Sequence, residues 1–355
     1  MSDDKLIDFI EQVSGGSHLR VEENLGEGFV RLRIEEAERR QAKHDIRCIE
    51  DTVIELLRNA RDAHAHSIYI ASQKEGEERR LTVIDDGDGI PAELQELVFD
   101  ARVTSKLETM VEDDWGIHGR GMALFSIRSN TDEARIVSSA PGLGSAFRVA
   151  ASTAHLGEKV DQSSFPVLEL GESGELQVAR GPRNILRTAI EFALANRGAI
   201  HVYLGSNSEI AATLLEMSQR AVSADTLLFV DDPETLPVAQ RLAMATDAAE
   251  FIRIASSIGL DISERTAHRV LAGQISPQSD LLSQAKKSRY RHKKADIFKD
   301  SRGLKLASED VQAFSREMEK AFELLAARYY ISLTDLPKVQ IKGDVITVRF
   351  PIEKD

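Results

Sequence analysis

The chain has little of what marks a secreted, membrane-spanning or disulfide-linked protein. Its 355 residues include a single cysteine, Cys48, so no disulfide can form within the chain. No stretch approaches the ~20 uninterrupted apolar residues that a membrane-spanning helix needs. The first residues, Met1-Ser-Asp-Asp-Lys, lack the basic and apolar pattern of a secretory signal. We therefore expect a cytoplasmic protein with no membrane partner.

The chain also has no excess of positive charge, since 45 Lys and Arg residues face 58 Asp and Glu residues. The formal net charge is −13, so the surface as a whole does not attract nucleic acid, and any such contact has to be local. Apolar residues make up 42% of the chain, which is enough to form real cores. A chain of 355 residues is long enough for two or three domains, and no internal repeat divides it.

The first informative motif is an expected helical segment, Glu55-Leu-Leu-Arg-Asn-Ala-Arg-Asp-Ala63. Its polar residues Glu55, Asn59 and Asp62 are spaced at i, i+4 and i+7, which places them on one helix face. A carboxylate and an amide one turn apart can serve an activated water and a hard metal ion, respectively. Mg²⁺ needs few protein oxygens where waters and phosphates supply the rest. Taken alone, the same spacing is typical of an amphipathic helix with a solvated acidic face.

The second motif is a strand that runs into a glycine-rich turn. Arg80–Ile84 is expected to be the strand, and Asp85-Asp-Gly-Asp-Gly89 is the turn. The glycines let the backbone pass close to a flat ligand, while the Asp85 carboxylate can accept a hydrogen bond from an exocyclic amine. A calcium loop is the alternative, but Gly87 and Gly89 interrupt the acids and the glutamate that an EF-hand needs is missing.

Two further glycine-rich segments follow. Gly116-Ile-His-Gly-Arg-Gly121 opens a helical run, and backbone amides at a helix start bind phosphate. No Lys-Ser or Lys-Thr follows Gly121, so the segment is not a P-loop, and it does not suit a dinucleotide-binding fold. Gly142–Val149 is expected to be a turn into a closing strand, from which the Ser145 hydroxyl could reach a base.

These motifs, in this order, resemble the GHKL superfamily of Bergerat-fold ATPases. That superfamily includes gyrase-type topoisomerases, ninety-kilodalton heat-shock chaperones, histidine kinases and MutL mismatch-repair proteins. The resemblance is to the MutL and topoisomerase VI type, and it covers roughly residues 45–150. Besides Glu55–Ala63, it rests on Val103-Thr-Ser-Lys106, which is similar to a Thr-Ser-Lys lid element, and on Gly119–Ile127, which is similar to a Gly-x-Ala-Leu-x-Ser-Ile run.

The resemblance implies ATP and Mg²⁺ as cofactors and assigns roles to single residues. Glu55 would be the general base for water, and Asn59 the magnesium ligand. Asp85 would bind the adenine amino group, supported by Ser145. The other nucleotide-binding positions implied are Asp62, Gly87, Gly89, Ile90, Lys106, Gly116, Gly119, Arg120 and Gly121. Two positions depart from the family pattern: Asp86 replaces the usual Asn, and His118 with Arg120 makes the glycine loop more basic.

The function implied is a Mg-dependent ATPase in which slow hydrolysis switches conformation or dimer state. The alternative is an ATP-gated, DNA-associated or regulatory binding protein with incidental hydrolysis. A histidine-kinase-like protein is a third reading, and His44-Asp45 invites that comparison. However, His44 lies too close to Glu55 for the helical hairpin of such kinases, and the usual proline is missing.

The expected fold class is α+β. A Bergerat-fold α/β sandwich is predicted over residues 1–155, with a polar linker at Thr153–Ser164. A second, transducer-like α+β domain is predicted over 156–245 and a helical region over 246–305. A C-terminal helix and β-hairpin are predicted over 306–355.

Within the helical region, Phe251–Leu271 resembles a helix-turn-helix whose second helix is capped by Ser263. Arg265, His268 and Arg269 would then point outward, as residues that contact DNA do. A helical hairpin in an accessory domain is the alternative.

The basic run Lys286–Lys294 follows this region. Such runs are usually solvated linkers, but this one favours a DNA contact through residues 254–294, and an acidic protein partner would serve as well. By resemblance to MutL-like relatives, whose lids close as two ATP domains meet, we also expect an ATP-dependent homodimer.

Overall fold

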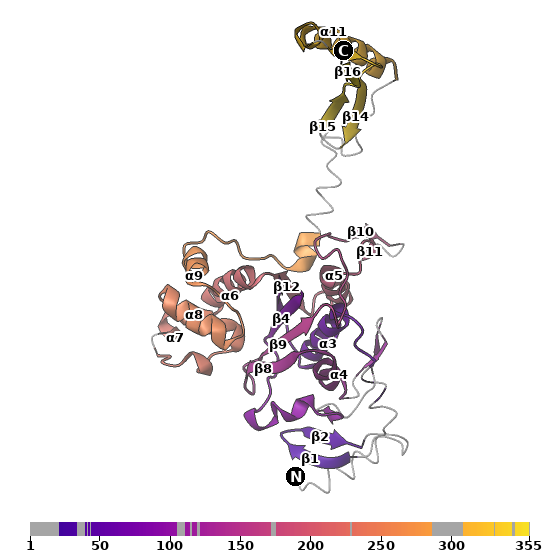
Figure 1. Ribbon diagram of the computed structural model, residues 1–355. Coiled ribbons are helices and arrows are strands. Elements are labelled where there is room, and N and C mark those ends of the chain that lie inside the picture. The colour runs from indigo at the N-terminus through magenta and orange to yellow at the C-terminus, as the bar shows by residue number, and fades with distance from the viewer. Residues whose placement is uncertain are drawn as a thin grey trace. The chain divides into compact units, whose positions relative to one another are not determined.

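The computed structural model describes residues 21–33, 40, 42, 44–104, 111–113, 116–118, 121–171, 175–227, 229–285, 308–329, 331–342 and 345–354. The chain divides into two compact units, a large one that ends at Lys286 and a small one that begins at Lys287. The large unit is a sheet covered by helices on both faces (Figure 1). In its described residues, the small unit combines one helix with two short antiparallel strand pairs.

A five-stranded mixed sheet forms the centre of the large unit, in the order β12-β3-β4-β9-β8. Strand β12 runs parallel to β3, and the other neighbours are antiparallel. The bounds are β3 Ser67–Glu75, β4 Glu78–Asp85, β8 Glu133–Ser139, β9 Ser145–Ser152 and β12 His201–Gly205. The predicted strand Arg80–Ile84 is thus confirmed as the middle of β4, the central strand.

The strands of this sheet are apolar on both sides, which explains the two helical layers. On β3, Ile68 and Ile70 belong to one hydrophobic cluster, whereas Tyr69 and Ala71 belong to the other. Because successive side chains point to opposite faces, a strand that is apolar at every position needs cover on both. Tyr69 also stacks on Tyr203 of β12, with ring centroids 4.9 Å apart.

Helices α3 (Ile49–Asp62), α4 (Ala123–Asn130) and α5 (Ile185–Ala195) cover the first face (Figure 1). Helix α3 is amphipathic, and Val53 and Leu57 on its apolar side are fully buried. At its start, the Asp51 carboxylate accepts hydrogen bonds from the amides of Arg47 and Cys48. Such a carboxylate satisfies amides that have no partner inside the helix.

The second face is covered by α6 (Asn207–Ala221), the 3₁₀ segment η4 (Val238–Met244), α8 (Ala248–Ser257) and α9 (Glu264–Leu271). Phe251 and Ile258 are fully buried there. The turn between α8 and α9 touches the sheet, because the Thr82 hydroxyl donates a 2.8 Å hydrogen bond to the carbonyl of Gly259. The two helices therefore belong to the large unit's core.

These contacts join segments that were predicted from the sequence to be separate domains, with boundaries after residues 155 and 245. Strand β12 pairs with β3, and α5 packs on α3, so residues 156–285 complete the sheet and both of its faces. The segment expected as a linker is also tied to α3, since Lys159 and Gln162 both donate to the Glu50 carboxylate. Periodicity predicts single elements, but it does not specify which strand pairs with which.

The remaining elements of the large unit lie around this sandwich. Strands β1 (Val21–Gly26), β2 (Phe29–Leu32) and β5 (Val103–Thr104) form a small sheet, and two hairpins pair β6 (Val111–Asp113) with β7 (Gly116–His118) and β10 (Val167–Leu170) with β11 (Leu176–Arg180). Short helical turns are η1 (Ala92–Leu94), η2 (Leu97–Phe99), α7 (Ala224–Leu227) and η3 (Pro233–Thr235).

The small unit contains α11 (Ser308–Tyr329), the pair β13 (Ile331–Leu333) with β16 (Ile352–Lys354), and the hairpin β14 (Lys338–Lys342) with β15 (Val345–Arg349). Phe322 of α11 stacks on Phe350 at 5.2 Å. The expected α+β class is thus confirmed, whereas the basic run Lys286–Lys294 lies outside the described residues. Across the described part of the chain, no helix has the length and apolar character to span a membrane.

The shared core makes a testable prediction. We expect Phe251→Ala to lower the free energy of unfolding by about 3–5 kcal/mol, because it leaves a cavity under a fully buried ring. Hydrogen exchange should then accelerate in β4 and β9 as well as in α8. Leu271→Ala, at a partly buried position of the same cluster, is the control with a smaller expected loss. Unchanged exchange in β4 and β9 would show that residues 156–285 unfold separately.

Candidate active site

Helix α3 brings the predicted catalytic face to the surface. Glu55 and Asp62 are partly exposed there, with side chains 19% and 18% accessible. The Glu55 carboxylate accepts a 2.6 Å hydrogen bond from Arg58 Nη1, and Asp62 accepts one of 3.1 Å from Arg61 Nε. The two carboxylates are thus held by arginines of their own helix, on one side of α3.

Asn59 lies between these acids and is half-buried. Its Nδ2 atom is buried, and within the described residues it has no hydrogen-bond partner. A buried amide left in this way costs about 1–3 kcal/mol. A phosphate oxygen would satisfy Nδ2, and the oxygen of the same amide is the type of ligand that Mg²⁺ takes. The residue therefore fits its predicted place beside a nucleotide and its metal.

Asp85 occupies the carboxyl end of β4 and is 2% exposed. Its Oδ1 accepts a 2.9 Å hydrogen bond from the amide of Gly87. The amide of Ser145, its register partner on β9, also donates to the carboxylate. Burial raises the pKa of Asp85 to about 7, and the two amide bonds offset only part of that effect. A buried carboxyl group of this kind is suited to a polar ligand group such as an exocyclic amine.

Bare main chain forms the wall beside Asp85. A Cβ on Gly144 would lie 2.2 Å from the carbonyl oxygen of Asp85, and one on Gly87 would lie 2.9 Å from Asp85 Oδ1. Gly89 has a φ of +74°, and a Cβ there would come within 1.9 Å of the carbonyl oxygen of Ala140. No side chain fits at these positions, because the protein's own backbone packs too closely there, so only glycine is compatible with this arrangement beside Asp85.

Two side chains that the sequence did not predict hold this wall in place. The Ser139 hydroxyl accepts a 2.7 Å hydrogen bond from the Ile90 amide and contacts the Gly144 carbonyl at 3.1 Å. Gln95 Nε2 donates to the carbonyls of Ser139 and Ile90. The Ser145 hydroxyl, expected to reach the base, lies 2.9 Å from the Ser139 hydroxyl. It is therefore the amide of Ser145 that contacts Asp85.

Asp86, which departs from the family pattern, has a different partner. Its Oδ1 accepts hydrogen bonds of 2.7 and 2.8 Å from the amides of His66 and Ser67, at the start of β3. The carboxylate therefore secures the neighbouring strand. Its negative charge is also one of the causes that raise the pKa of Asp85.

The glycine loop is described in part. Gly116 begins β7, opposite Asp113 of β6. Gly121, with a φ of +65°, accepts a 2.8 Å hydrogen bond at its carbonyl from the amide of Arg102. Helix α4 follows, and its N-cap residue, Met122, forms no capping hydrogen bond with its side chain. Amides of this kind are suitable donors for a phosphate. The predicted positions Lys106, Gly119 and Arg120 lie outside the described residues.

Comparisons with known proteins match this region. The model of the family described as histidine kinase-, DNA gyrase B- and HSP90-like ATPase matches residues 46–159. The DNA mismatch repair protein MutL of Thermus thermophilus is 40% identical over 80 residues, which are 22% of this chain and 14% of that protein. MutL of Limosilactobacillus reuteri (strain DSM 20016) is 41% identical over 83 residues, and MutL of Lactiplantibacillus plantarum 43% over 83. Each of these two matches covers 22% of this chain and 12% of the relative.

The likeness is therefore to one part of each protein, since the chain covers 14% or less of the relatives' length. The family model spans α3, the hairpin β3–β4, α4 and the strands β8 and β9. It thus includes every residue of the candidate site, from the acidic face of α3 to the glycine wall at Asp85. Residues 46–159 are a MutL-like ATPase domain of the GHKL superfamily.

Proposed function

We propose that this domain binds ATP together with Mg²⁺ and hydrolyses it. The observation that carries the proposal is the buried Asp85 carboxyl group beside a wall of main chain, at the end of the central strand. The adenine amino group would donate to Asp85, and the ring would lie along the backbone at Gly89 and Ile90. The phosphates would then extend toward Asn59 and the glycine loop.

Glu55 is the candidate general base. It would take a proton from the water that attacks the γ-phosphorus, as the bond to the oxygen bridging the β- and γ-phosphates breaks and ADP and phosphate form. Arg58 holds the carboxylate through the 2.6 Å ion pair, which limits the positions that Glu55 can adopt. When bound, Mg²⁺ supplies positive charge to the phosphate oxygens. Asn59, one turn along α3, would be the residue that binds it.

Hydrolysis of this type would act as a switch between conformational or dimer states. The proposal rests on the likeness to MutL, and on the Thr, Ser, Gly and charged residues in Val103–Gly116, which suit a lid. An ATP-gated protein that works on DNA is the second candidate. Two observations favour it: the relatives bear the name DNA mismatch repair protein, and α9 has an exposed basic face. Both candidates would operate in the cytoplasm.

The role of Glu55 can be tested by Glu55→Ala. We expect the variant to bind ATP with near-normal affinity but to lose roughly 10²–10⁴-fold in turnover, because a positioned base contributes about that much. With γ-labelled ATP, the wild-type label should appear as free phosphate and not on the protein, which also separates an ATPase from a kinase. Glu77→Ala, at an exposed turn position, is the control. Wild-type turnover in Glu55→Ala would rule the assignment out.

The role of Asp85 makes a prediction in which function and stability move in opposite directions. Asp85→Asn should weaken ATP binding, because the amide presents a donor as well as an acceptor to the adenine amino group. The same variant should be more stable than the wild type above pH 7. The wild-type group keeps its proton when folded up to about pH 7 but has a pKa of 3.8 when unfolded. Its free energy of unfolding therefore falls as pH rises through that window.

The full difference corresponds to roughly 4 kcal/mol above pH 7 and should vanish below about pH 4. Chemical denaturation of both proteins between these pH values, without nucleotide, measures it. A stability difference that is the same at every pH would mean that burial does not raise the pKa of Asp85.

The dimer switch predicts a change of mass. A non-hydrolysable ATP analogue should convert the protein from 39.3 kDa to about twice that mass in light scattering, whereas ADP should not. Asp85→Asn should not respond at concentrations that saturate the wild type. An unchanged mass with a saturating analogue would remove dimerisation from the proposal but leave hydrolysis standing.

A further inference from the structure

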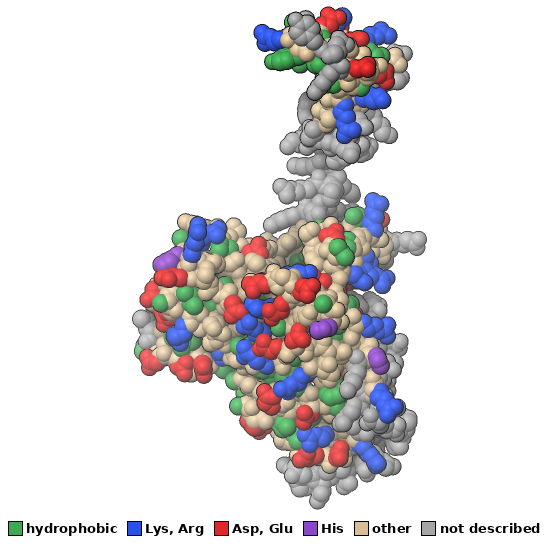
Figure 2. All heavy atoms as spheres, viewed as in Figure 1, with side chains coloured by type: hydrophobic (Ala, Val, Ile, Leu, Met, Phe, Trp, Pro, Cys, Tyr) green, Lys and Arg blue, Asp and Glu red, His purple; other side chains and the backbone are tan. Residues whose placement is uncertain are grey.

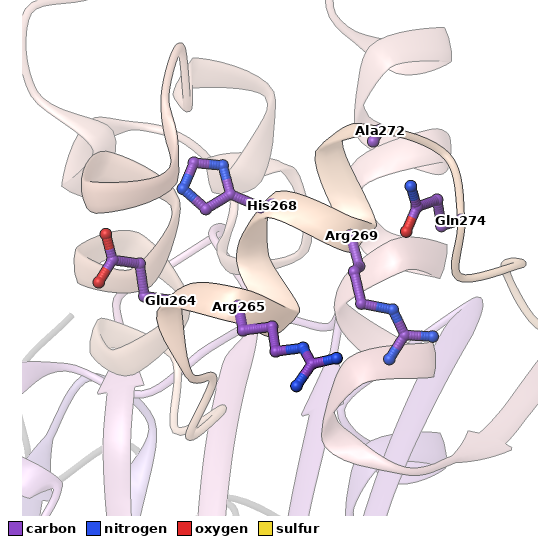
Figure 3. A pocket seen from close by; sticks show the side chains of 6 residues that line it. All are labelled: Glu264, Arg265, His268, Arg269, Ala272 and Gln274. Atoms are coloured by element: carbon purple, nitrogen blue, oxygen red, sulfur yellow. The ribbon is translucent and has the colours of Figure 1, made fainter.

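The outer face of α9 presents a basic surface that the ATPase reaction does not use. Arg265, His268 and Arg269 are exposed on it. A shallow hollow is lined there by Glu264, Arg265, His268, Arg269, Ala272 and Gln274 (Figure 3). Figure 2 shows basic side chains and a histidine over this helix, with acidic side chains directly beside the histidine.

The helix that bears this surface is firmly held. Ala267 and Val270, on its inner side, are buried in the core. The Ser263 hydroxyl accepts a 3.3 Å hydrogen bond from the amide of Thr266 and so caps the helix. At the other end, the amide of Gln274 donates to the carbonyl of Arg269 at 2.9 Å. The exposed face is therefore presented in a fixed orientation.

Arg265 and Arg269 are two exposed arginines on one helix of an acidic protein. Among the described residues, neither makes a side-chain hydrogen bond or an ion pair, although the chain carries a net charge of −13. Other arginines of this layer are paired, as Arg148 is with Asp261, Arg220 with Glu216 and Arg253 with Glu250. Like charges four residues apart destabilise a helix, so Arg265 and Arg269 together do not stabilise α9.

The arrangement of the two side chains suits a phosphate backbone. Their guanidinium groups lie on the same side of α9, whereas the Gln274 amide lies near Ala272 at the C-terminal end of the helix, away from both (Figure 3). A guanidinium group donates two parallel hydrogen bonds to phosphate oxygens. Glu264 and His268 lie toward the other side of the helix, so the Glu264 carboxylate is directed away from the two arginines.

We infer that Arg265 and Arg269 bind the phosphodiester backbone of duplex DNA, with α9 as the exposed helix of the α8–α9 hairpin. The hollow is shallow and open along the helix, which fits a polymer that lies across the surface better than an enclosed small anion. Helix-turn-helix proteins present a second helix to DNA in this way. This surface is distinct from the candidate nucleotide site, and the inference rests on the second candidate function, a protein that works on DNA.

The test compares two double variants of the full chain that remove equal charge. Arg265→Ala/Arg269→Ala deletes the proposed contacts. Arg180→Ala/Arg183→Ala removes two exposed arginines that also have no partner among the described residues. The affinity for a labelled duplex is measured by fluorescence anisotropy between 50 and 300 mM salt. ATP turnover and the unfolding midpoint should be unchanged in both variants, which confirms that they are folded.

We expect the plot of log affinity against log salt to be flatter by about 1.8 in the first variant, or ~0.9 for each phosphate that is no longer neutralised. The control should keep the wild-type slope. Arg265→Lys/Arg269→Lys should restore most of the slope, because the charge remains. The inference is overturned if the wild type does not bind duplex DNA at 50 mM salt, if both double variants lose slope equally, or if polyglutamate-coated beads retain the protein through Arg265 and Arg269 while DNA does not.

Discussion

The large unit depends on one constraint: the central sheet is apolar on both faces and must be covered on both. Strand β4 lies between β3 and β9, with Leu81 and Val83 in one hydrophobic cluster and Ile84 in the other. The helices around α3 satisfy one side, and those from α6 to α9 satisfy the second. The end of such a strand is a rigid, water-poor place, and it is there that the chain carries Asp85.

A carboxyl group at that place costs the protein stability, and its surroundings limit the cost. Two amides donate to it, and the glycine wall lets them come close. Strained or destabilising groups persist where the surrounding structure holds them, and they concentrate at binding sites. Asp85, whose burial lowers the stability of the protein, is also the residue that would select adenine. Its pKa therefore bears directly on its proposed function.

Local spacing predicted the parts of the site that one element carries. Glu55 and Asn59 share a face because they are one helical turn apart, and Asp85 ends a strand that a glycine-rich turn follows. Ser139 and Gln95 could not be found in this way. Ser139 bonds to Ile90, 49 residues earlier in the chain, and Gln95 bonds to Ser139 across 44 residues. Their types are common in loops, so only the strand pairing identifies them.

The sequence predicted the helical pair α8–α9 but not that it covers the second face of the central sheet, for a related reason. The α+β character predicted for residues 156–245 agrees with the helices α5 and α6 and the strand β12 in that segment. The sequence pattern did not predict the pairing partner of β12. That partner is β3, which the sequence assigned to a different domain. A parallel pairing over so long a separation leaves no local signal, whereas the β3–β4 hairpin does.

The main-chain wall at Gly87, Gly89 and Gly144 has a consequence for how this pocket can evolve. Adjacent carbonyl oxygens leave no room for a methyl group. None of these glycines can therefore be replaced by even a slightly larger residue while the backbone stays in place. Substitutions are possible only at positions whose side chains point away from this wall. Asp86 is one of them, since its carboxylate binds the amides that begin β3. A change of nucleotide specificity at this wall would require a different loop backbone, because no single substitution of these glycines could alter the wall gradually.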